Sequence, residues 1–289
     1  MTEPGARLRL EQLLRTPVRE CRGLGGAHGV SHVRATLADG RVLFAKLAGR
    51  GAGEAGFEAE ARGLGWLAEA EAVPVPEVAG WDATALAIAW VPEEAPDGRA
   101  AEQFGRDLAR MHMSGAPAFG APWRGVIAGL PLGNDTSQSW PEWYAQHRLL
   151  PYARRAADDG WLTPADVRLV ETVAERAADL AGPAEPPSRI HGDCWSGNVL
   201  WSGGRGWLVD PAAHGGHRET DLATLALFGA PMQDRLFASY QEVAPLAAGW
   251  RGRIPLHQLH PLLVHVCLFG ASYRSAALDA ARAALASID

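Results

Sequence analysis

The sequence predicts an α+β fold with two lobes: a small, β-rich N-terminal lobe with one key helix, and a larger, mostly helical C-terminal lobe. Two runs of alternating apolar residues flank Asp39-Gly40, which is a strong short signal of a β-hairpin. Beyond residue 98 the apolar residues recur with helical spacing. A chain of 289 residues also lies where single cores tend to divide. We therefore expect lobes over residues 1–91 and 92–289.

The first lobe reads as strands around one helix. The segments 31–38 and 41–47 are the strands of the hairpin, and the glycine-rich stretch 22–31 precedes them as a turn. Helical apolar spacing covers 56–70. An extended segment, a buried strand and a linker follow at 73–81, 84–91 and 91–98.

The second lobe shows helical patterns over 99–113, 141–157 and 164–181. Residues 189–210 read as a loop and a hairpin, with a Ser-Gly-Gly-Arg-Gly turn. Helices resume from about Asp221 and continue to the end of the chain.

Composition excludes several classes of protein. With 47% hydrophobic and 21% charged residues, the chain reads as soluble and globular. A net charge of -6 without a basic block argues against nucleic acid as a partner. Cys21, Cys194 and Cys267 lie too far apart to indicate zinc or a disulfide framework, which fits a reduced cytoplasm. The N-terminus is too charged for a signal peptide, and the most apolar stretch, 261–273, is too short for a bilayer. We expect a cytoplasmic protein with no membrane partner.

A polar motif indicates phosphoryl transfer. His191-x-Asp193-x-x-x-x-Asn198 has the spacing of the protein-kinase catalytic loop, and Asp210 ends an apolar run further on. Asp193 would accept the proton of an attacking hydroxyl, while Asn198 and Asp210 offer the oxygen ligands that Mg²⁺ prefers. The same residues could instead cap a local turn. The complete set, with a hairpin placing Asp210 at a strand end, favours a kinase that uses ATP and Mg²⁺.

Lys46 is the candidate cation for the phosphates of ATP. It shares a face with Phe44 on an apolar strand, where an unpaired lysine is costly to bury. In the helix that follows, Glu60 falls within the apolar stripe and Glu58 outside it, so Glu60 is the expected partner. A snorkelling lysine and a solvated glutamate are the alternative.

Backbone groups complete the expected nucleotide site. Gly25 and Gly26 precede the lysine strand, where backbone N–H groups could cover the phosphates. The glycine spacing is not the kinase pattern, and a plain flexible turn is the alternative. The buried strand that ends before Pro92 suggests a hinge, so we expect backbone groups of Ala89, Trp90 and Val91 to bind adenine.

Three longer strings resemble the fructosamine kinase (ketosamine-3-kinase) family: HGDCWSGNVLW, LVDPAAHGGHRETDLATLALFG and FEAEARGLGWL. That family is a branch of the aminoglycoside-phosphotransferase-like, protein-kinase-like fold. The similarity runs through most of the chain and is sharpest over 189–229. It implies ATP-dependent phosphorylation of the sugar 3-hydroxyl of a ketosamine, such as a ribulosamine, erythrulosamine or fructosamine. Because the product sheds its sugar, the resemblance implies a role in protein deglycation.

The resemblance also implies roles for single residues. Asp193 is the proton acceptor, Asn198 and Asp210 hold magnesium, and Lys46 with Glu60 positions the phosphates. The acceptor side would be lined by the following residues: Trp195, His217, Arg218 and Glu219.

Among these, Trp195 would pack on the sugar, although a core role is the alternative. Glu219 would meet the cationic amine of the ketosamine. Asp221, at a helix start, is expected to brace the catalytic loop. Some family members carry a redox-active cysteine in the glycine-rich loop, where this chain has His28, so we do not transfer thiol regulation.

The expected partner is a small-molecule ketosamine or a glycated lysine on a protein, and we expect a monomer or weak dimer. Two other functions stay open. One is a kinase of another hydroxyl compound, such as an aminoglycoside or a choline-like molecule. The other is a nucleotide-binding pseudokinase, against which the intact Asp193, Asn198 and Asp210 argue.

Overall fold

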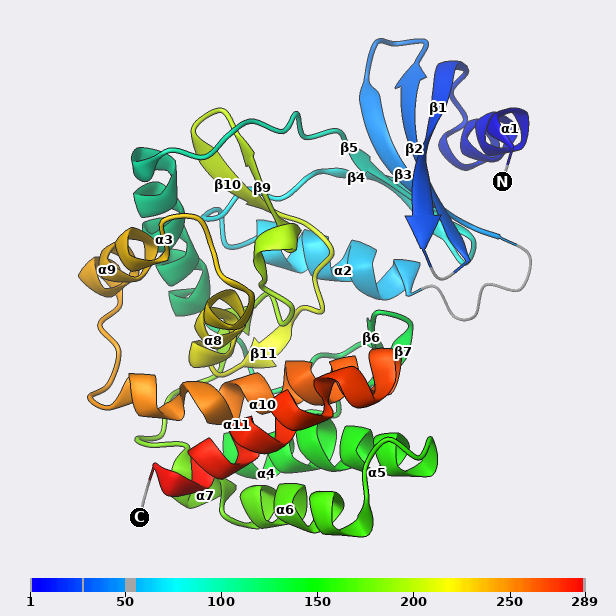
Figure 1. Cartoon of the computed structure of the whole chain (residues 1–289). Coiled ribbons are helices and arrows are strands. Elements are labelled where there is room, and N and C mark those ends of the chain that lie inside the picture. Colours follow the sequence, from blue (N-terminus) through cyan, green and yellow to red (C-terminus); the bar gives the residue numbers. More distant parts are fainter. Residues whose placement is uncertain (1, 28, 50–55, 288–289) are drawn as a thin grey trace.

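The computed structural model describes residues 2–27, 29–49 and 56–287, and it combines a β-rich N-terminal part with a helical part. Figure 1 shows the twisted sheet at one end of the molecule and the bulk of the helices at the other. The sheet is antiparallel, with the strand order β1-β2-β3-β5-β4. Its strands are β1 (Val18–Ala27), β2 (Val30–Leu37), β3 (Val42–Ala48), β4 (Val78–Asp82) and β5 (Ala85–Ala89).

The hairpin predicted around Asp39-Gly40 is confirmed. β2 and β3 pair from Thr36 opposite Val42 onward, and the Asp39 carboxylate accepts the N–H of Arg41 in the turn at 3.0 Å. Since side chains alternate along a strand, this register directs Lys46 to the opposite face from the buried core residues on either side of it.

Most of the glycine-rich stretch 22–31, which was predicted as a turn, belongs to strands, with a turn at Gly29. Gly25 and Gly26 belong to β1 and pair with β2. A Cβ atom at Gly26 would lie 2.1 Å from the carbonyl oxygen of Val30, so the close approach of the two strands requires glycine. Apolar alternation gave no strand signal because β1 is an edge strand and mostly exposed. His28 lies outside the described residues.

Two helices cover the sheet, where the sequence predicted one. α1 (Glu3–Leu14) packs on one face through Ala6 and Leu10. The predicted helix, α2 (Phe57–Ala68), packs on the other face, with Phe57 against β5. α1 escaped prediction because charged residues interrupt its short apolar stripe.

Helices are present at the positions predicted in the second part, but the helix predicted over 164–181 is divided at Arg176 into two helices. The segment predicted as one helix over 141–157 contains a π-helical turn, η1 (Ala145–Leu149), between two α-helices. The α-helices are α3 (Gly98–Met113), α4 (Trp140–Tyr144), α5 (Leu150–Asp158), α6 (Pro164–Glu175), α7 (Ala177–Leu180), α8 (Glu219–Phe228), α9 (Gln233–Val243), α10 (Trp250–Phe269) and α11 (Arg274–Ala286).

Short strand pairs lie between these helices. The predicted hairpin over 189–210 is β9 with β10, while β6 with β7 and β8 with β11 were not predicted, because three residues give too short an alternation to recognise. Their bounds are β6 (Gly125–Ile127), β7 (Leu130–Leu132), β8 (Ser188–Ile190), β9 (Val199–Ser202), β10 (Arg205–Leu208) and β11 (His214–Gly216).

The most apolar stretch of the sequence belongs to α10. By length and composition the segment Trp250–Ala286 passes as a membrane span, although 56% of its most apolar window is buried within the protein. A 3₁₀ turn, η3 (Gly270–Tyr273), separates α10 from α11. α10 carries buried His257 and His260 and contributes to the largest apolar core. These features are typical of a helix in the core of a folded domain.

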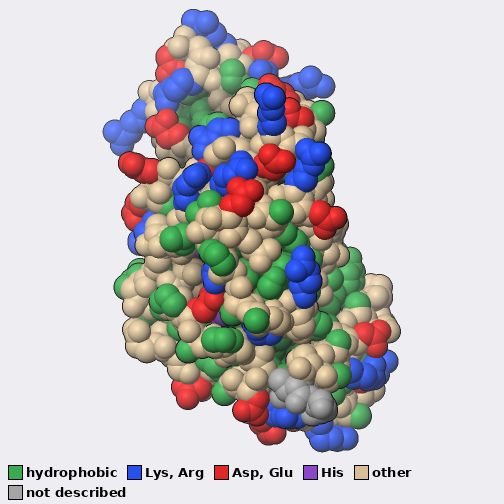
Figure 2. All heavy atoms as spheres, turned by 90° about the vertical axis from the view of Figure 1, so that its left-hand side faces the viewer, with side chains coloured by type: hydrophobic (Ala, Val, Ile, Leu, Met, Phe, Trp, Pro, Cys, Tyr) green, Lys and Arg blue, Asp and Glu red, His purple; other side chains and the backbone are tan. Residues whose placement is uncertain are grey.

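Residues 90–97 connect the sheet to α3 without regular secondary structure. The predicted lobe boundary between residues 91 and 92 falls in this segment and stays a prediction. On the face shown in Figure 2, basic and acidic side chains are intermixed, which agrees with the small net charge.

Candidate active site

The loop after β8 holds Asp193 and Asn198 together. The side-chain nitrogen of Asn198 donates to the carboxylate of Asp193 at 3.0 Å and to the backbone oxygen of Asp193 at 2.9 Å. Because the nitrogen makes both bonds, the amide oxygen of Asn198 is the atom that could contact a cation. The imidazole of His191 anchors the loop by donating to the carbonyl oxygen of Val209 at 2.9 Å.

A buried carboxylate holds this loop by accepting hydrogen bonds from its backbone. Asp221, in the first turn of α8, accepts the backbone N–H groups of His191 at 2.7 Å and Gly192 at 2.9 Å. The ring of His112 contacts the same carboxylate at 3.0 Å, and Tyr240 contacts the other ring nitrogen at 2.8 Å. Burial opposes ionisation of Asp221, but the hydrogen bond and charge of His112 outweigh it and lower the pKa of Asp221. The expected bracing role of Asp221 is confirmed.

Lys46 joins both parts of the molecule. Its ammonium donates to Glu60 of α2 at 2.9 Å and to the carboxylate of Asp210, which follows β10. The predicted pair of Lys46 and Glu60 is therefore present, and Asp210 shares the same cation. The backbone of Asp210 has a φ of 54°, in the left-handed region that aspartate tolerates better than most residues.

Lys46, Glu60 and Asp210 form a buried trio in which the charge of each group affects the protonation of the other two. Burial alone would lower the pKa of Lys46, but the two carboxylates raise it, so the ammonium stays charged. Burial raises the pKa of Glu60 in spite of Lys46. Burial also opposes ionisation of Asp210, yet Lys46 outweighs it and lowers the pKa of that carboxyl. Asp210 is thus the carboxylate of this trio best suited to hold a cation.

Asp193 is poised near neutral pH. Burial raises the pKa of this carboxyl to about 7, the charges of Asp210 and Asp221 add to the increase, and the hydrogen bond from Asn198 opposes it. A general base works best with a pKa near the operating pH, because it is then both available and able to take a proton.

These residues line one cleft of about 840 Å³. Its walls include the predicted pair of Lys46 and Glu60, the loop residues Asp193 and Asn198, and Asp210. Trp195 also lines the cleft and is 39% exposed, so the alternative of a core tryptophan is wrong. Oxygen donors from Asn198 and Asp210 beside a charged lysine are the set of groups that a magnesium-bound polyphosphate requires.

The expected hinge contacts are only partly open to adenine. The backbone N–H of Ala89 donates to Glu77 at 2.8 Å, and that of Trp90 donates to Val42 at 2.9 Å. Those two donors are therefore engaged within the protein. The expectation that backbone groups of Ala89, Trp90 and Val91 bind adenine stays a prediction for their carbonyl groups and for the N–H of Val91. Gly25 and Gly26 lie on β1 just before Ala27, which lines the cleft.

The expectation that His217, Arg218 and Glu219 line the acceptor side is wrong. Both carboxylate oxygens of Glu219 accept from Arg253, at 2.9 and 2.5 Å. Arg218 donates to Glu185 at 2.6 and 2.7 Å. Glu219 begins α8 and Arg218 directly precedes it, and ion pairs inside the helical part neutralise the charges of both residues.

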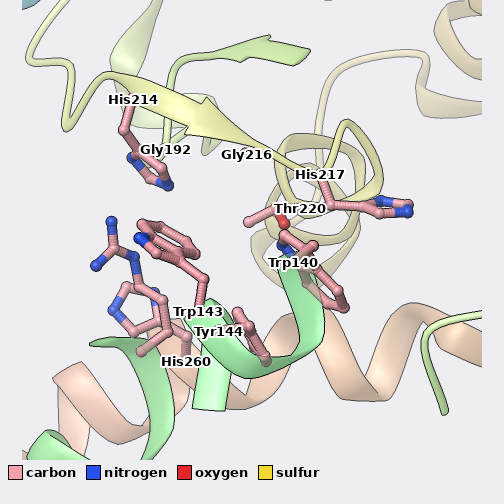
Figure 3. Close-up of a pocket in the computed structure, with 10 residues that line it drawn as sticks. Trp140, Trp143, Tyr144, Gly192, His214, Gly216, His217, Thr220 and His260 are labelled. Atoms are coloured by element: carbon pink, nitrogen blue, oxygen red, sulfur yellow. The ribbon is translucent and has the colours of Figure 1, made fainter. Parts of the chain in front are cut away.

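His217 instead borders a small internal cavity of about 10 Å³, separate from the cleft. Figure 3 shows this cavity enclosed by aromatic and histidine side chains, with Trp140 and Trp143 from α4 and His214 from β11. Burial lowers the pKa of His214 to about 3, so this ring is neutral. The cavity has the size of about one water molecule and is too small for a sugar.

Several lining residues escaped the sequence prediction. The β6–β7 hairpin contributes Val126 to Leu130, and the end of α8 contributes Phe228. Three more come from the helices that follow, namely His265, Phe269 and Tyr273. His265, Phe269 and Tyr273 follow one another at intervals of four residues, a spacing that places side chains on one face of a helix. This spacing could have revealed them in the sequence.

Residues 16–287 match the sequence profile of the fructosamine kinase family. A candidate ketoamine kinase of Escherichia coli K12 is 33% identical over 223 residues, covering 75% of this chain and 77% of the relative. Protein-ribulosamine 3-kinase of Arabidopsis thaliana is 33% identical over 241 residues, covering 80% of this chain and 72% of the relative.

Solved structures agree with these matches. A candidate fructosamine-3-kinase from Thermobifida fusca superposes with a TM-score of 0.92 and 55% identity, covering 97% of this chain and 98% of that protein. An ADP-bound aminoglycoside phosphotransferase superposes with a TM-score of 0.66 at 13% identity, which shows the fold alone. The predicted protein-kinase-like fold class is confirmed.

Proposed function

The chain belongs to the fructosamine kinase family, and on this premise we propose that it transfers the γ-phosphoryl group of ATP to the sugar 3-hydroxyl of a ketosamine. The acceptor is a free ketosamine or a glycated lysine side chain of a protein. The observation that carries the proposal is the convergence of Asp193, Asn198, Asp210 and Lys46 on one cleft.

Each residue has one task in the reaction. The Asp193 carboxylate accepts the proton of the 3-hydroxyl as its oxygen forms the new bond to the γ-phosphorus. The bond from that phosphorus to the bridging oxygen of ADP breaks, and ADP leaves with the bonding electrons. Lys46, held by Glu60 at 2.9 Å, places its positive charge on the phosphates.

Asn198 and Asp210 fit Mg²⁺ because both are oxygen donors lining the same cleft. When bound there, the ion would neutralise charge on the phosphates. Lys46 also contacts the carboxylate of Asp210, so the lysine and the cation would share this carboxylate.

An acceptor panel tests the proposal. Release of ADP would be measured with a ribulosamine, an erythrulosamine and a fructosamine, and in parallel with an aminoglycoside and with choline. We expect turnover with at least one ketosamine and none above background with the other two compounds. Turnover with only an aminoglycoside or choline would replace the proposed acceptor. Nucleotide binding without any turnover would favour a pseudokinase.

The proposal extends to the oligomeric state of the enzyme and to the division of its tasks between the two lobes. We infer a cytoplasmic enzyme that works as a monomer or weak dimer, with the nucleotide bound by residues 1–91 and the acceptor by residues 92–289. The glycine-rich strand β1 would cover the phosphates through the backbone around Gly25 and Gly26. Light scattering tests whether the protein is a monomer or a weak dimer. Limited proteolysis near residue 92 tests the boundary between the two lobes.

A further inference from the structure

The cleft continues beyond Asp193 along rings that phosphoryl transfer does not require. Trp195 contacts Phe228 with ring centroids 5.9 Å apart, and Phe228 contacts His265 at 5.1 Å. His265 contacts Phe269 at 5.4 Å and Tyr273 at 4.7 Å. These five residues, the aromatic row, all line the cleft and come from the catalytic loop, α8, α10 and η3.

The row begins beside the catalytic loop. Trp195 stands two positions after Asp193 and is 39% exposed. Phe269 is at the other end of the series of ring contacts, here called the outer end, and is 52% exposed. An exposed aromatic ring next to a functional cleft is a typical site for binding the apolar part of a ligand, which removes the ring from water. The β6–β7 hairpin adds apolar Val126 and Ile127 to the same cleft.

The row is also uncharged. Among the described residues that line the cleft, the carboxylates are Glu60, Asp193 and Asp210, and all three serve the phosphoryl-transfer end. His265 is held at 2.7 Å by the carbonyl oxygen of Pro261, and burial lowers the pKa of its ring, so it is neutral. An acceptor with several ammonium groups would find no carboxylate along this row.

We propose that the aromatic row binds the amine side of the ketosamine and selects an adduct on a lysine side chain over an adduct on a short amine. This inference rests on the proposed function and specifies its substrate. It also replaces Glu219, which Arg253 occupies, as the group that receives the cationic nitrogen.

The chemistry of the acceptor fits the row. In a ketosamine, three carbons separate the 3-hydroxyl from the secondary ammonium, so a hydroxyl at Asp193 leaves the nitrogen close by. Aromatic faces attract such a cation, and Trp195, two positions after Asp193, with its neighbour Phe228 offers such faces at the start of the row. The methylene groups of a lysine side chain would then lie along His265, Phe269 and Tyr273, where they lose contact with water.

The test compares two acceptors that share one ribulosamine head. One is the adduct of methylamine, and the other is the Nε adduct of Nα-acetyl-lysine methylamide. The quantity measured is the ratio of kcat/KM for the lysine adduct to kcat/KM for the methylamine adduct. We expect a ratio of about 10 or more in the wild type, as for the burial of two methylene groups.

Substitutions at the outer end then locate the effect. Phe269→Ala should lower the ratio by roughly threefold to tenfold, while Phe269→Trp, which keeps a ring, should preserve it. Trp81→Ala removes a comparably exposed ring from β4, far along the sheet, and is the matched control. Because Phe269 is half exposed, its loss should leave the unfolding temperature nearly unchanged, which a thermal scan verifies.

Each outcome decides the inference. A wild-type ratio near one, or an unchanged ratio in Phe269→Ala, would overturn the role of the row while leaving the proposed function standing. Failure of both adducts and of the erythrulosamine and fructosamine of the acceptor panel to react, with ATP binding intact, would overturn the proposed function and this inference with it.

Discussion

The carboxylate of Asp221 accepts the backbone N–H of His191 across 30 positions of the chain, at 2.7 Å and fully buried. This contact ties the start of α8 to the loop that carries Asp193. A buried carboxylate with several hydrogen bonds is difficult to replace, because each donor would otherwise remain unsatisfied.

Replacement of Asp221 by Asn should therefore destabilise the fold and disorder the loop. The expected loss of unfolding free energy is about 2–4 kcal/mol, since a charged acceptor for several donors becomes neutral. Urea denaturation measures this loss, and Asp234→Asn on the exposed surface of α9 is the control. Equal stability of the two variants would show that Asp221 does not hold the loop.

The pairing of Lys46 with Glu60 predicts a clear difference between two glutamates on α2. Glu60→Gln should lower kcat/KM for ATP by about 30-fold, because it replaces the carboxyl that holds the buried ammonium of Lys46, and a hydrogen bond to a charged group contributes on the order of 2 kcal/mol. Glu58→Gln should have no effect, since Glu58 is exposed and pairs with Arg62. Steady-state kinetics at varied ATP would separate them, and similar values would refute the orienting role of Glu60.

Asp193 should reduce the stability of the ligand-free protein above neutral pH. In the folded state the pKa of Asp193 is about 7, which lies above the usual aspartate pKa of 3.8, so the folded state holds the proton more tightly between these two values. Its favourable contribution to stability is complete below pH 3.8 and is lost as the pH rises through 7.

Asp193→Asn should accordingly be more stable than the wild type at pH 8, and this difference should diminish toward pH 5. Thermal unfolding across that range, without nucleotide or metal, provides the measurement. A difference that stayed constant with pH would show that the carboxyl at position 193 titrates normally.

Gly192 should tolerate no side chain. Its φ is 80°, and a Cβ atom would lie 2.3 Å from the carbonyl oxygen of Ala212. Gly192→Ala should lower the unfolding free energy by about 2 kcal/mol or more. Gly65→Ala, in the exposed middle of α2 with open space around it, should raise it by about 0.5–1 kcal/mol. Loss of stability in both variants would rule out this local explanation.

The sequence allowed prediction of features that depend on local pattern. Asp39-Gly40 fixed the hairpin, the hairpin fixed the face of Lys46, and the apolar stripe of α2 selected Glu60 over Glu58. Each step uses a period or a spacing within about 30 residues, which is why the inner part of the candidate site was predictable.

Features set by distant partners were not predictable in this way. Arg218 and Glu219 appeared available because they are charged, but Glu185 and Arg253, over 30 positions away, neutralise them in the interior. The aromatic row joins rings from separate helices, so no single stretch displays it. β1 was missed because it is a mostly exposed edge strand, so its residues show no apolar alternation.

The most direct measurement is the single-turnover rate of phosphoryl transfer from ATP to a ribulosamine in Asp193→Asn, with Mg²⁺ present and ATP affinity determined separately. Loss of a general base at this position should reduce that rate by about 10²–10⁴-fold while ATP still binds. A variant that transfers phosphate to the 3-hydroxyl as fast as the wild type would contradict the account.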